Sequence, residues 1–293
     1  MGPKMRGAIA ALTMSVLLAY PAASAAARTP AVTSGSRYLA LGDSVTFGYQ
    51  EAFVVPAPNY HVAAGFLGYP EQLGTELHQI VANAACPGET SGSLIDPSAQ
   101  SNGCENAPGS SGGYRTAFPL HVRYSGSQLA YAVRYLKHHG DVTLVSLMIG
   151  ANDLFLCQET THDACTNPSE LAATVVQVRH NVRQILSAIR RKALYRGQLA
   201  IVNYYSLNYN TAFVTGAVVA LNHAVDSAAK PFGVEIANGF GEFKAASLRF
   251  GLNPCQAALL TVDPTKPSLS CGVHPSYAGQ ALLAQALETA IRL

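Results

Sequence analysis

Four short polar blocks in this 293-residue sequence contain residue types that can act on an acyl group. They are Gly42-Asp43-Ser44-Val45, Cys86-Pro87-Gly88-Glu89-Thr90, Gly150-Ala151-Asn152-Asp153 and Val273-His274-Pro275-Ser276. A serine hydroxyl becomes an effective nucleophile when a base removes its proton, and histidine titrates close to neutral pH. We therefore predict Ser44 as a nucleophile and His274 as its general base.

Three of the blocks follow runs that we predict as strands, and one of these runs, Asp141–Ile149, has the pattern of a strand that is buried on both faces. These pairs are Tyr38–Leu41 with Ser44, Ile80–Ala84 with Gly88, and Asp141–Ile149 with Asn152. The fourth block, with His274, opens the final predicted helix, Ser276–Ile291. Because parallel α/β sheets carry their chemistry at the carboxyl ends of the strands, we expect the four blocks to meet at one edge.

Helical patterns alternate with these strands along the chain. The predicted helices are Pro70–Gln79, Gln128–His138, Ser169–Arg191 and Thr215–Ala229, and the further strands are Gln198–Tyr204 and Val234–Ile236. Alternation of this kind predicts βαβ units, with helices on both faces of a mainly parallel sheet. We therefore predict an α/β fold, a three-layer α/β/α sandwich of flavodoxin-like build.

Taken together and in this order, the blocks resemble the SGNH hydrolases, also called GDSL esterases and lipases. That family is named for a Ser, a Gly, an Asn and a His, which match Ser44, Gly88, Asn152 and His274. The resemblance spans Tyr38–Leu293. It implies an oxyanion hole made of the Ser44 N–H, the Gly88 N–H and the Asn152 side-chain amide. Loss of one such donor typically costs on the order of 3 kcal/mol of transition-state stabilisation.

The reaction that the resemblance implies is acyl transfer to water through an acyl-Ser44 intermediate, without a metal or an organic cofactor. Carboxylic esters are the expected substrates, with lipid or small acyl esters favoured. The family also includes carbohydrate deacetylases and lysophospholipases, so the sequence leaves open whether the chain is a lipase, an esterase or a deacetylase.

The sequence departs from the family pattern at the residue that orients the histidine. The family usually has an Asp three residues before the His, and this chain has Cys271 there. We favour the backbone carbonyl of Cys271 as the acceptor for His274, as in carbonyl-assisted Ser-His members of the family. Asp263 is the alternative acceptor. The missing Asp also allows a different interpretation of the whole chain, as a catalytically degenerate, exported binding module on the same fold.

The first 25 residues have the pattern of a secretory signal peptide. Lys4 and Arg6 precede the apolar run Gly7–Tyr20, and Ala23-Ser24-Ala25 matches an A-x-A cleavage site. The run is too short for a comfortable membrane span. We therefore predict a signal peptide at 1–25, a linker at 26–37, and a catalytic domain at 38–293 that is secreted without stable membrane insertion.

Six cysteines in an exported chain are typical of disulfides, and 15 pairings are possible. We predict nearest-neighbour pairs, Cys86–Cys104, Cys157–Cys165 and Cys255–Cys271; no C-x-x-C or H-x-x-x-H spacing supports zinc instead. Without the signal peptide, 17 basic residues balance 17 acidic ones, and no basic cluster indicates nucleic-acid binding. The expected partner is a small-molecule or lipid ester, bound by a monomer.

Overall fold

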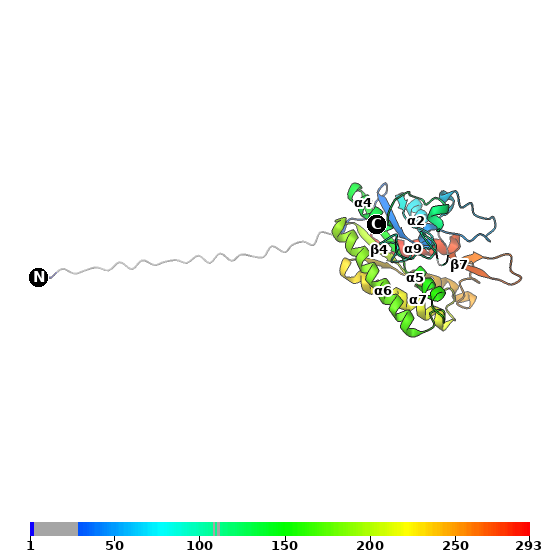
Figure 1. The fold of residues 1–293 in the computed structure, drawn as a ribbon. Coiled ribbons are helices and arrows are strands. Elements are labelled where there is room, and N and C mark those ends of the chain that lie inside the picture. Colours follow the sequence, from blue (N-terminus) through cyan, green and yellow to red (C-terminus); the bar gives the residue numbers. More distant parts are fainter. Residues whose placement is uncertain (3–28, 108, 110–111) are drawn as a thin grey trace.

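The computed structural model describes residues 1–2, 29–107, 109 and 112–293 (Figure 1). Almost all of the predicted signal peptide lies outside these residues, as does the start of the predicted linker. From Thr29 onward, the described chain runs into the first strand of the domain.

A five-stranded parallel sheet forms the centre of the domain, in the order β2-β1-β3-β4-β5. Its strands are β1 Arg37–Gly42, β2 Ile80–Asn83, β3 Val142–Met148, β4 Gln198–Val202 and β5 Glu235–Ala237. The central strands β1, β3 and β4 are buried almost throughout, as expected for a sheet covered on both faces. The predicted parallel sheet is confirmed.

Helices cover both faces of the sheet (Figure 1). One face carries α2 (Tyr69–Glu76), α9 (Tyr277–Ala290) and, packed on α9, α8 (Gly239–Ser247). The other carries α4 (Gln128–His138), α5 (Ala151–Thr160), α6 (Pro168–Ser187) and α7 (Ala212–Ala229). Shorter turns are α1 (Ser44–Phe47), α3 (Tyr114–Ala117), η1 (Ala63–Gly65), η2 (Ala188–Lys192), η3 (Lys230–Phe232) and η4 (Leu248–Phe250). The three-layer prediction is confirmed.

His274 lies in a strand, whereas the sequence placed it at the opening of the last helix. An antiparallel hairpin, β6 (Leu260–Val262) with β7 (Cys271–Pro275), precedes α9 and carries His274. Ser276 caps α9, its side chain accepting from the Gly279 N–H, so the helix begins only after the hairpin. The hairpin projects beside the main sheet in Figure 1.

All three predicted disulfides are formed. Cys86–Cys104 closes the loop that contains Gly88, and Cys157–Cys165 joins α5 to the turn that follows it. Cys255–Cys271 ties the start of β7 to the segment before β6. Two of the three bonds therefore cross-link loops that carry predicted site residues.

Among the described helices, the stretch Ala212–Phe232 is long and apolar enough to cross a membrane by length and composition. Its second half is largely buried, including Leu221, Val225 and Ala228, and it packs against α6 and β4. Core helices of folded domains have this same pattern.

Candidate active site

The turn between β1 and α1 presents Ser44. Gly42 ends the strand with φ +151°, and a Cβ there would lie 2.3 Å from the Met148 carbonyl oxygen, so only glycine fits. Asp43 caps α1 by accepting from the Val45 N–H at 2.9 Å. Among the described residues the Ser44 hydroxyl has no hydrogen-bond partner, and Ser44 lines two cavities.

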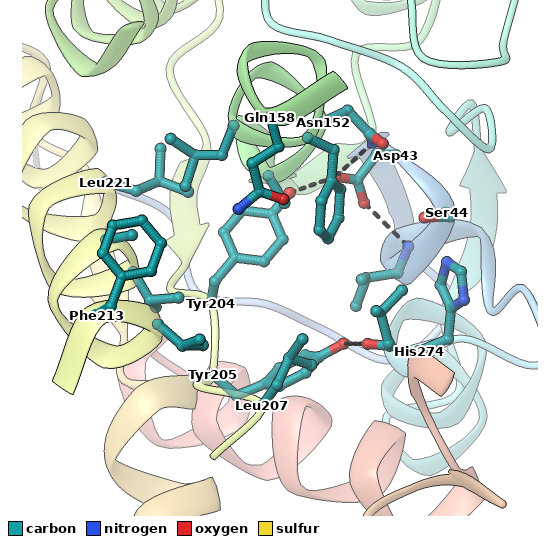
Figure 2. A pocket seen from close by; sticks show the side chains of 18 residues that line it. Asp43, Ser44, Asn152, Gln158, Tyr204, Tyr205, Leu207, Phe213, Leu221 and His274 are labelled. Atoms are coloured by element: carbon teal, nitrogen blue, oxygen red, sulfur yellow. Dashed lines mark hydrogen bonds between the residues drawn. The ribbon is translucent and has the colours of Figure 1, made fainter. Parts of the chain in front are cut away.

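Asp43 stabilises the turn that presents Ser44 and makes no hydrogen bond to the imidazole of His274. The Tyr204 hydroxyl donates to its Oδ2, and the Asn152 Nδ2 lies 3.4 Å from the same oxygen. Burial raises the pKa of Asp43 to about 6, although the hydrogen bonds from Tyr204 and Val45 act in the opposite direction. The side chain therefore connects the Ser44 turn to α5 and to the segment after β4 (Figure 2).

A carboxylate holds the ring of His274. Glu51 Oε1 lies 2.9 Å from His274 Nδ1, and it also accepts from the backbone N–H groups of Val273 (3.0 Å) and His274 (3.3 Å). The Thr261 hydroxyl donates to Oε2 at 2.5 Å. Burial raises the pKa of Glu51, but the contacts from His274 and Thr261 outweigh it, so the net pKa is below its ordinary value.

This geometry corrects the expected acceptor for His274. The carbonyl of Cys271 does not fill that role, because Nδ1 pairs with Glu51. Asp263 lies in the hairpin turn, where it accepts from the Thr265 hydroxyl (2.6 Å) and the Thr265 N–H (3.0 Å). The carbonyl-assisted interpretation is therefore wrong here. The sequence analysis missed Glu51, which is an acid in an irregular segment seven residues after Ser44.

Gly88 adopts a conformation that requires glycine. Its φ is +84°, and a Cβ would lie 2.5 Å from the Asn102 carbonyl oxygen. The Asn102 N–H in turn donates to the Gly88 carbonyl at 2.8 Å. Gly88 lines the same cavity as Ser44, Asn152 and His274, so the four predicted positions meet at one edge of the sheet.

Asn152 is the second residue of α5, shortly after the end of β3, and is almost fully buried. Its Nδ2 donates to the Glu89 carbonyl at 3.0 Å, and its Oδ1 accepts from Asn102 Nδ2 at 3.3 Å. The contact of Nδ2 with Asp43, at 3.4 Å, is the longest of the three. The amide thus joins the Ser44 turn to the Gly88 loop.

Two further side chains hold the Gly88 loop in place. Gln128 Nε2 donates to the Gly42 carbonyl and to Glu89 Oε2, both at 3.0 Å, while its Oε1 accepts from the Gly42 N–H at 2.7 Å. Asp153 accepts from the Ser91 N–H at 2.8 Å and the Ser91 hydroxyl at 2.6 Å. Glu89 is buried and Asp153 is half-buried, and loss of contact with water raises the pKa of the Glu89 carboxyl to about 7 and that of the Asp153 carboxyl to about 6.

Two cavities meet at Ser44 and His274, and both are bounded by Asn152, Phe155 and Val273. The first cavity, of about 250 Å³, extends between α5 and α7. Figure 2 shows Phe213 and Leu221 of α7 on the side of this cavity opposite Ser44 and His274. The second cavity, of about 280 Å³, is also lined by Tyr49, Pro87, Gly88, Asn102, Gly103 and Tyr114.

In the described part of the chain, two groups of side chains come close enough to share a metal ion. They are Cys86, Glu89 and Cys104, and Cys157, Cys165 and Glu170. In both groups the two cysteines are joined in a disulfide, so neither offers the thiolate ligands that a zinc site needs.

Solved structures with the same fold include several ester hydrolases. Phospholipase A1 from Streptomyces albidoflavus NA297 superimposes with a TM-score of 0.55 at 17% identity, over 88% of this chain and 100% of that one. An acetylxylan esterase from Geobacillus stearothermophilus gives 0.51 at 19% identity, over 88% and 94%. The lipase Lip_vut3 from a goat rumen metagenome gives 0.52 at 14% identity, over 87% and 97%.

A comparison with curated protein sequences gives no match. The model of the GDSL-like lipase/acylhydrolase family matches residues 40–282, which include all four polar blocks. This match covers most of the chain, and the fold agrees with it. The chain therefore belongs to the GDSL-like lipase/acylhydrolase family and is a carboxylic ester hydrolase.

Proposed function

We propose that this ester hydrolase is exported and cleaves esters of apolar acyl chains through an acyl-Ser44 intermediate. The observation that carries the proposal is the hydrogen bond between Glu51 and His274, at the edge of a cavity that also contains Ser44. A carboxylate at Nδ1 fixes the imidazole tautomer, so that Nε2 is the basic nitrogen, and it stabilises the imidazolium when that ring is protonated.

Each step of the proposed reaction can be assigned to one of these groups. His274 takes the proton of Ser44 as the hydroxyl attacks the ester carbonyl, and then returns it to the departing alcohol. The free Ser44 hydroxyl is compatible with this role, since catalytic hydrogen bonds often tighten only when substrate is bound. A water molecule activated by His274 then hydrolyses the acyl-enzyme and restores Ser44.

The oxyanion would be stabilised by the N–H groups of Ser44 and Gly88 and by Asn152 Nδ2. The positive φ of Gly88, which glycine adopts without strain, brings its backbone into the cavity wall without a side chain in the way. The long Nδ2 contact with Asp43 is the weakest that Asn152 makes, so an oxyanion could replace it at little cost.

The lining of the first cavity supports acyl chains longer than acetyl. Its α5 and α7 walls consist mainly of aliphatic and aromatic side chains, among them Leu154, Phe213, Val218 and Leu221. Each buried CH₂ group contributes roughly 0.8 kcal/mol to binding, a contribution that an acetyl ester cannot make. A lipid or alkyl ester therefore fits this cavity better than the acetylated carbohydrate of a deacetylase.

A non-catalytic binding module was plausible only because no acid precedes His274 at the usual spacing. Glu51 removes that reason, since it provides a carboxylate from another part of the chain. Export is supported by the leader-like residues 1–25 and by the three disulfides, which are typical of oxidising compartments. A secreted chain whose N-terminal sequence begins at Ala26 would support both export and the proposed cleavage site.

Labelling with a fluorophosphonate tests the catalytic proposal directly. Wild-type protein should become labelled and should hydrolyse p-nitrophenyl octanoate faster than p-nitrophenyl acetate, whereas Ser44→Ala should do neither. Wild-type protein that is folded but unlabelled and inactive on both esters would overturn the proposal. Faster cleavage of acetate than of octanoate would favour the deacetylase instead.

A further inference from the structure

We infer that a cationic cleft beside the C-terminal half of α6 binds the phosphate groups of an anionic phospholipid surface and so attaches the protein to it. The cleft has a volume of about 430 Å³ and shares no lining residue with the two cavities at Ser44. Attachment of this kind needs contact with the head groups only and no membrane-spanning segment. The inference does not depend on the reaction proposed for Ser44.

The balanced net charge of the chain conceals an uneven distribution of charge. From Glu170 to Asp226 the sequence contains no other acidic residue. Six of the 19 lysines and arginines lie in one short span of this stretch: Arg179, Arg183, Arg190, Arg191, Lys192 and Arg196. The second half of α6 and the turn η2 therefore carry concentrated positive charge, which raises the local concentration of anions.

The cations that line the cleft do not hold the fold together. Arg183, Arg191 and Lys192 are exposed, and within the described residues their side chains make no hydrogen bond or ion pair. Arg190 differs, because it is half-buried and donates to the Phe232 carbonyl at 3.0 Å and to three further carbonyls. Three cationic groups therefore remain available to a ligand.

The dipole of the helix accounts for only part of this charge. Cations are favoured in the last turn of a helix, where Arg191 and Lys192 lie, but the effect falls off within that turn. Arg183 lies well before the end of η2. It is also four residues from Arg179, a spacing at which like charges destabilise a helix. A bound anion would offset this repulsion.

Apolar side chains adjoin the cations in the cleft. Leu129 and Ala188 are buried there, and Ile95 and Phe232 are half-buried. Arginine binds phosphate oxygens through paired hydrogen bonds, and the apolar wall can contact the glycerol and acyl carbons beside a lipid phosphate. The backbone of a nucleic acid has the phosphates but lacks the alkyl chains. The mixed lining therefore favours a phospholipid.

The position of η2 also suits a membrane surface. It precedes β4, whose first residue, Gln198, donates through Nε2 to the carbonyls of Pro30 (3.0 Å) and Arg292 (2.6 Å). The described chain thus joins the domain at this edge of the sheet. Ser44 follows the other end of a parallel strand, so the active site lies at the opposite edge. Figure 1 accordingly shows the C-terminus far from the hairpin that carries His274.

Sedimentation with vesicles tests the inference. Wild-type protein should bind vesicles of phosphatidylglycerol and not of phosphatidylcholine, and NaCl should weaken the binding because it screens exposed charges. Each basic residue at an anionic surface contributes about fivefold to the affinity, so Arg183→Gln/Arg191→Gln should bind phosphatidylglycerol about 25-fold more weakly. Its hydrolysis of p-nitrophenyl octanoate in solution should equal that of wild type.

Arg123→Gln/Arg249→Gln is the matched control. It removes the same charge from two exposed arginines that lie outside the cleft, so its affinity for the vesicles should stay within a few-fold of wild type. An equal loss in the two double variants would mean that net charge, and not the cleft, drives binding, and the inference would be wrong. It would also be wrong if wild-type protein did not bind phosphatidylglycerol, or bound duplex DNA more tightly at the same salt concentration.

Inorganic phosphate separates recognition of phosphate from attraction by charge. At constant ionic strength, phosphate should displace wild-type protein from phosphatidylglycerol vesicles more effectively than chloride does; equal displacement would contradict a phosphate site. Calorimetric binding of inorganic phosphate by a protein that does not bind the vesicles would assign the cleft to the free ion and overturn the lipid as its source. Fluorophosphonate labelling of Ser44 in the same samples tests the proposed function separately.

Discussion

Glu51 Oε1 lies 2.9 Å from His274 Nδ1, although the two residues are 223 positions apart in the sequence. Gln50, the residue before Glu51, also holds the chain next to His274, since its Nε2 donates to the Pro275 carbonyl at 3.0 Å. Two consecutive residues of the loop after α1 therefore hold the histidine ring and the backbone next to it. One continuous segment, 44–51, therefore carries Ser44, the proposed nucleophile, and holds His274, the proposed base.

Removal of the Glu51 carboxylate should slow catalysis strongly. Glu51→Ala leaves Nδ1 without an acceptor, so kcat should fall on the order of 10⁴, as for loss of a triad carboxylate elsewhere. Glu51→Gln should lose less, because an amide oxygen can still accept at Nδ1 while the amide nitrogen faces the Thr261 hydroxyl. Steady-state kinetics on p-nitrophenyl octanoate measure both changes.

Asp263→Asn is the matched control for these variants. Asp263 contacts Thr265 in the hairpin turn, so its amide variant should keep kcat close to the wild-type value. A large loss of kcat in Asp263→Asn, together with a small one in Glu51→Ala, would transfer the orienting role to Asp263.

Gly88→Ala should impair both folding and catalysis. The added Cβ would clash with the Asn102 carbonyl, and φ +84° is unfavourable for alanine. Loss of one oxyanion donor costs about 10²–10³ in kcat, and the displaced Gly88 N–H should produce a loss in that range.

Gly103→Ala separates backbone strain from the clash. Gly103 also has a positive φ, +115°, but a Cβ there meets no atom within 4 Å. We expect this variant to lower Tm while kcat changes much less than in Gly88→Ala. Similar losses of kcat in the two variants would mean that strain in the loop, and not the position of the Gly88 N–H, sets the rate.

Local patterns in the sequence were sufficient to predict the sheet and the meeting of four polar blocks. The buried strands β1, β3 and β4 are continuous apolar runs, and their carboxyl ends must share one edge in a parallel sheet. Ser44, Gly88 and Asn152 follow strands directly, so their common location could be derived from topology.

The partner of His274 could not be derived in this way. Glu51 lies in an irregular segment and reaches the imidazole only through the packing of the β6–β7 hairpin against the loop after α1. No periodicity or spacing encodes such a contact. Helix α5 was also missed, because its sequence mixes polar and apolar residues without a clear amphipathic face and starts within the Asn152 block.

The Cys255–Cys271 disulfide should matter for activity as well as for stability. For a loop of this length a disulfide contributes about 3 kcal/mol to the free energy of unfolding. Cys271 also lies only three residues before His274. The double variant Cys255→Ala/Cys271→Ala should unfold at lower urea concentration and have a reduced kcat. Urea titration and kinetics on the same samples measure both.

The Cys157–Cys165 bond provides the comparison for that experiment. It closes a shorter loop at the far end of α5, so its removal should lower stability with less effect on kcat. If the two double variants lose kcat equally, the Cys255–Cys271 bond has no specific role in holding His274.

Glu89→Gln should change how stability depends on pH. Burial raises the pKa of Glu89 from 4.5 to about 7, partly offset by hydrogen bonds from Ser93 and Gln128. Between these two values the folded state keeps the proton that the unfolded state has released, so this group lowers the free energy of unfolding as pH rises. The amide cannot ionise. The stability of Glu89→Gln relative to wild type should therefore increase between pH 5 and pH 8, by at most about 3 kcal/mol.

Urea denaturation at pH 5, 6, 7 and 8 measures this difference. The carboxyl groups of Asp43, Glu71 and Asp153 have raised pKa values in both proteins, so their contributions cancel in the comparison. Asp96→Asn is the control: hydrogen bonds from Ser98 lower the pKa of Asp96 below 3.8, so its titration ends before this range and its difference from wild type should stay constant. If the difference in free energy of unfolding between Glu89→Gln and wild type does not change with pH, then ionisation of Glu89 does not destabilise the folded state.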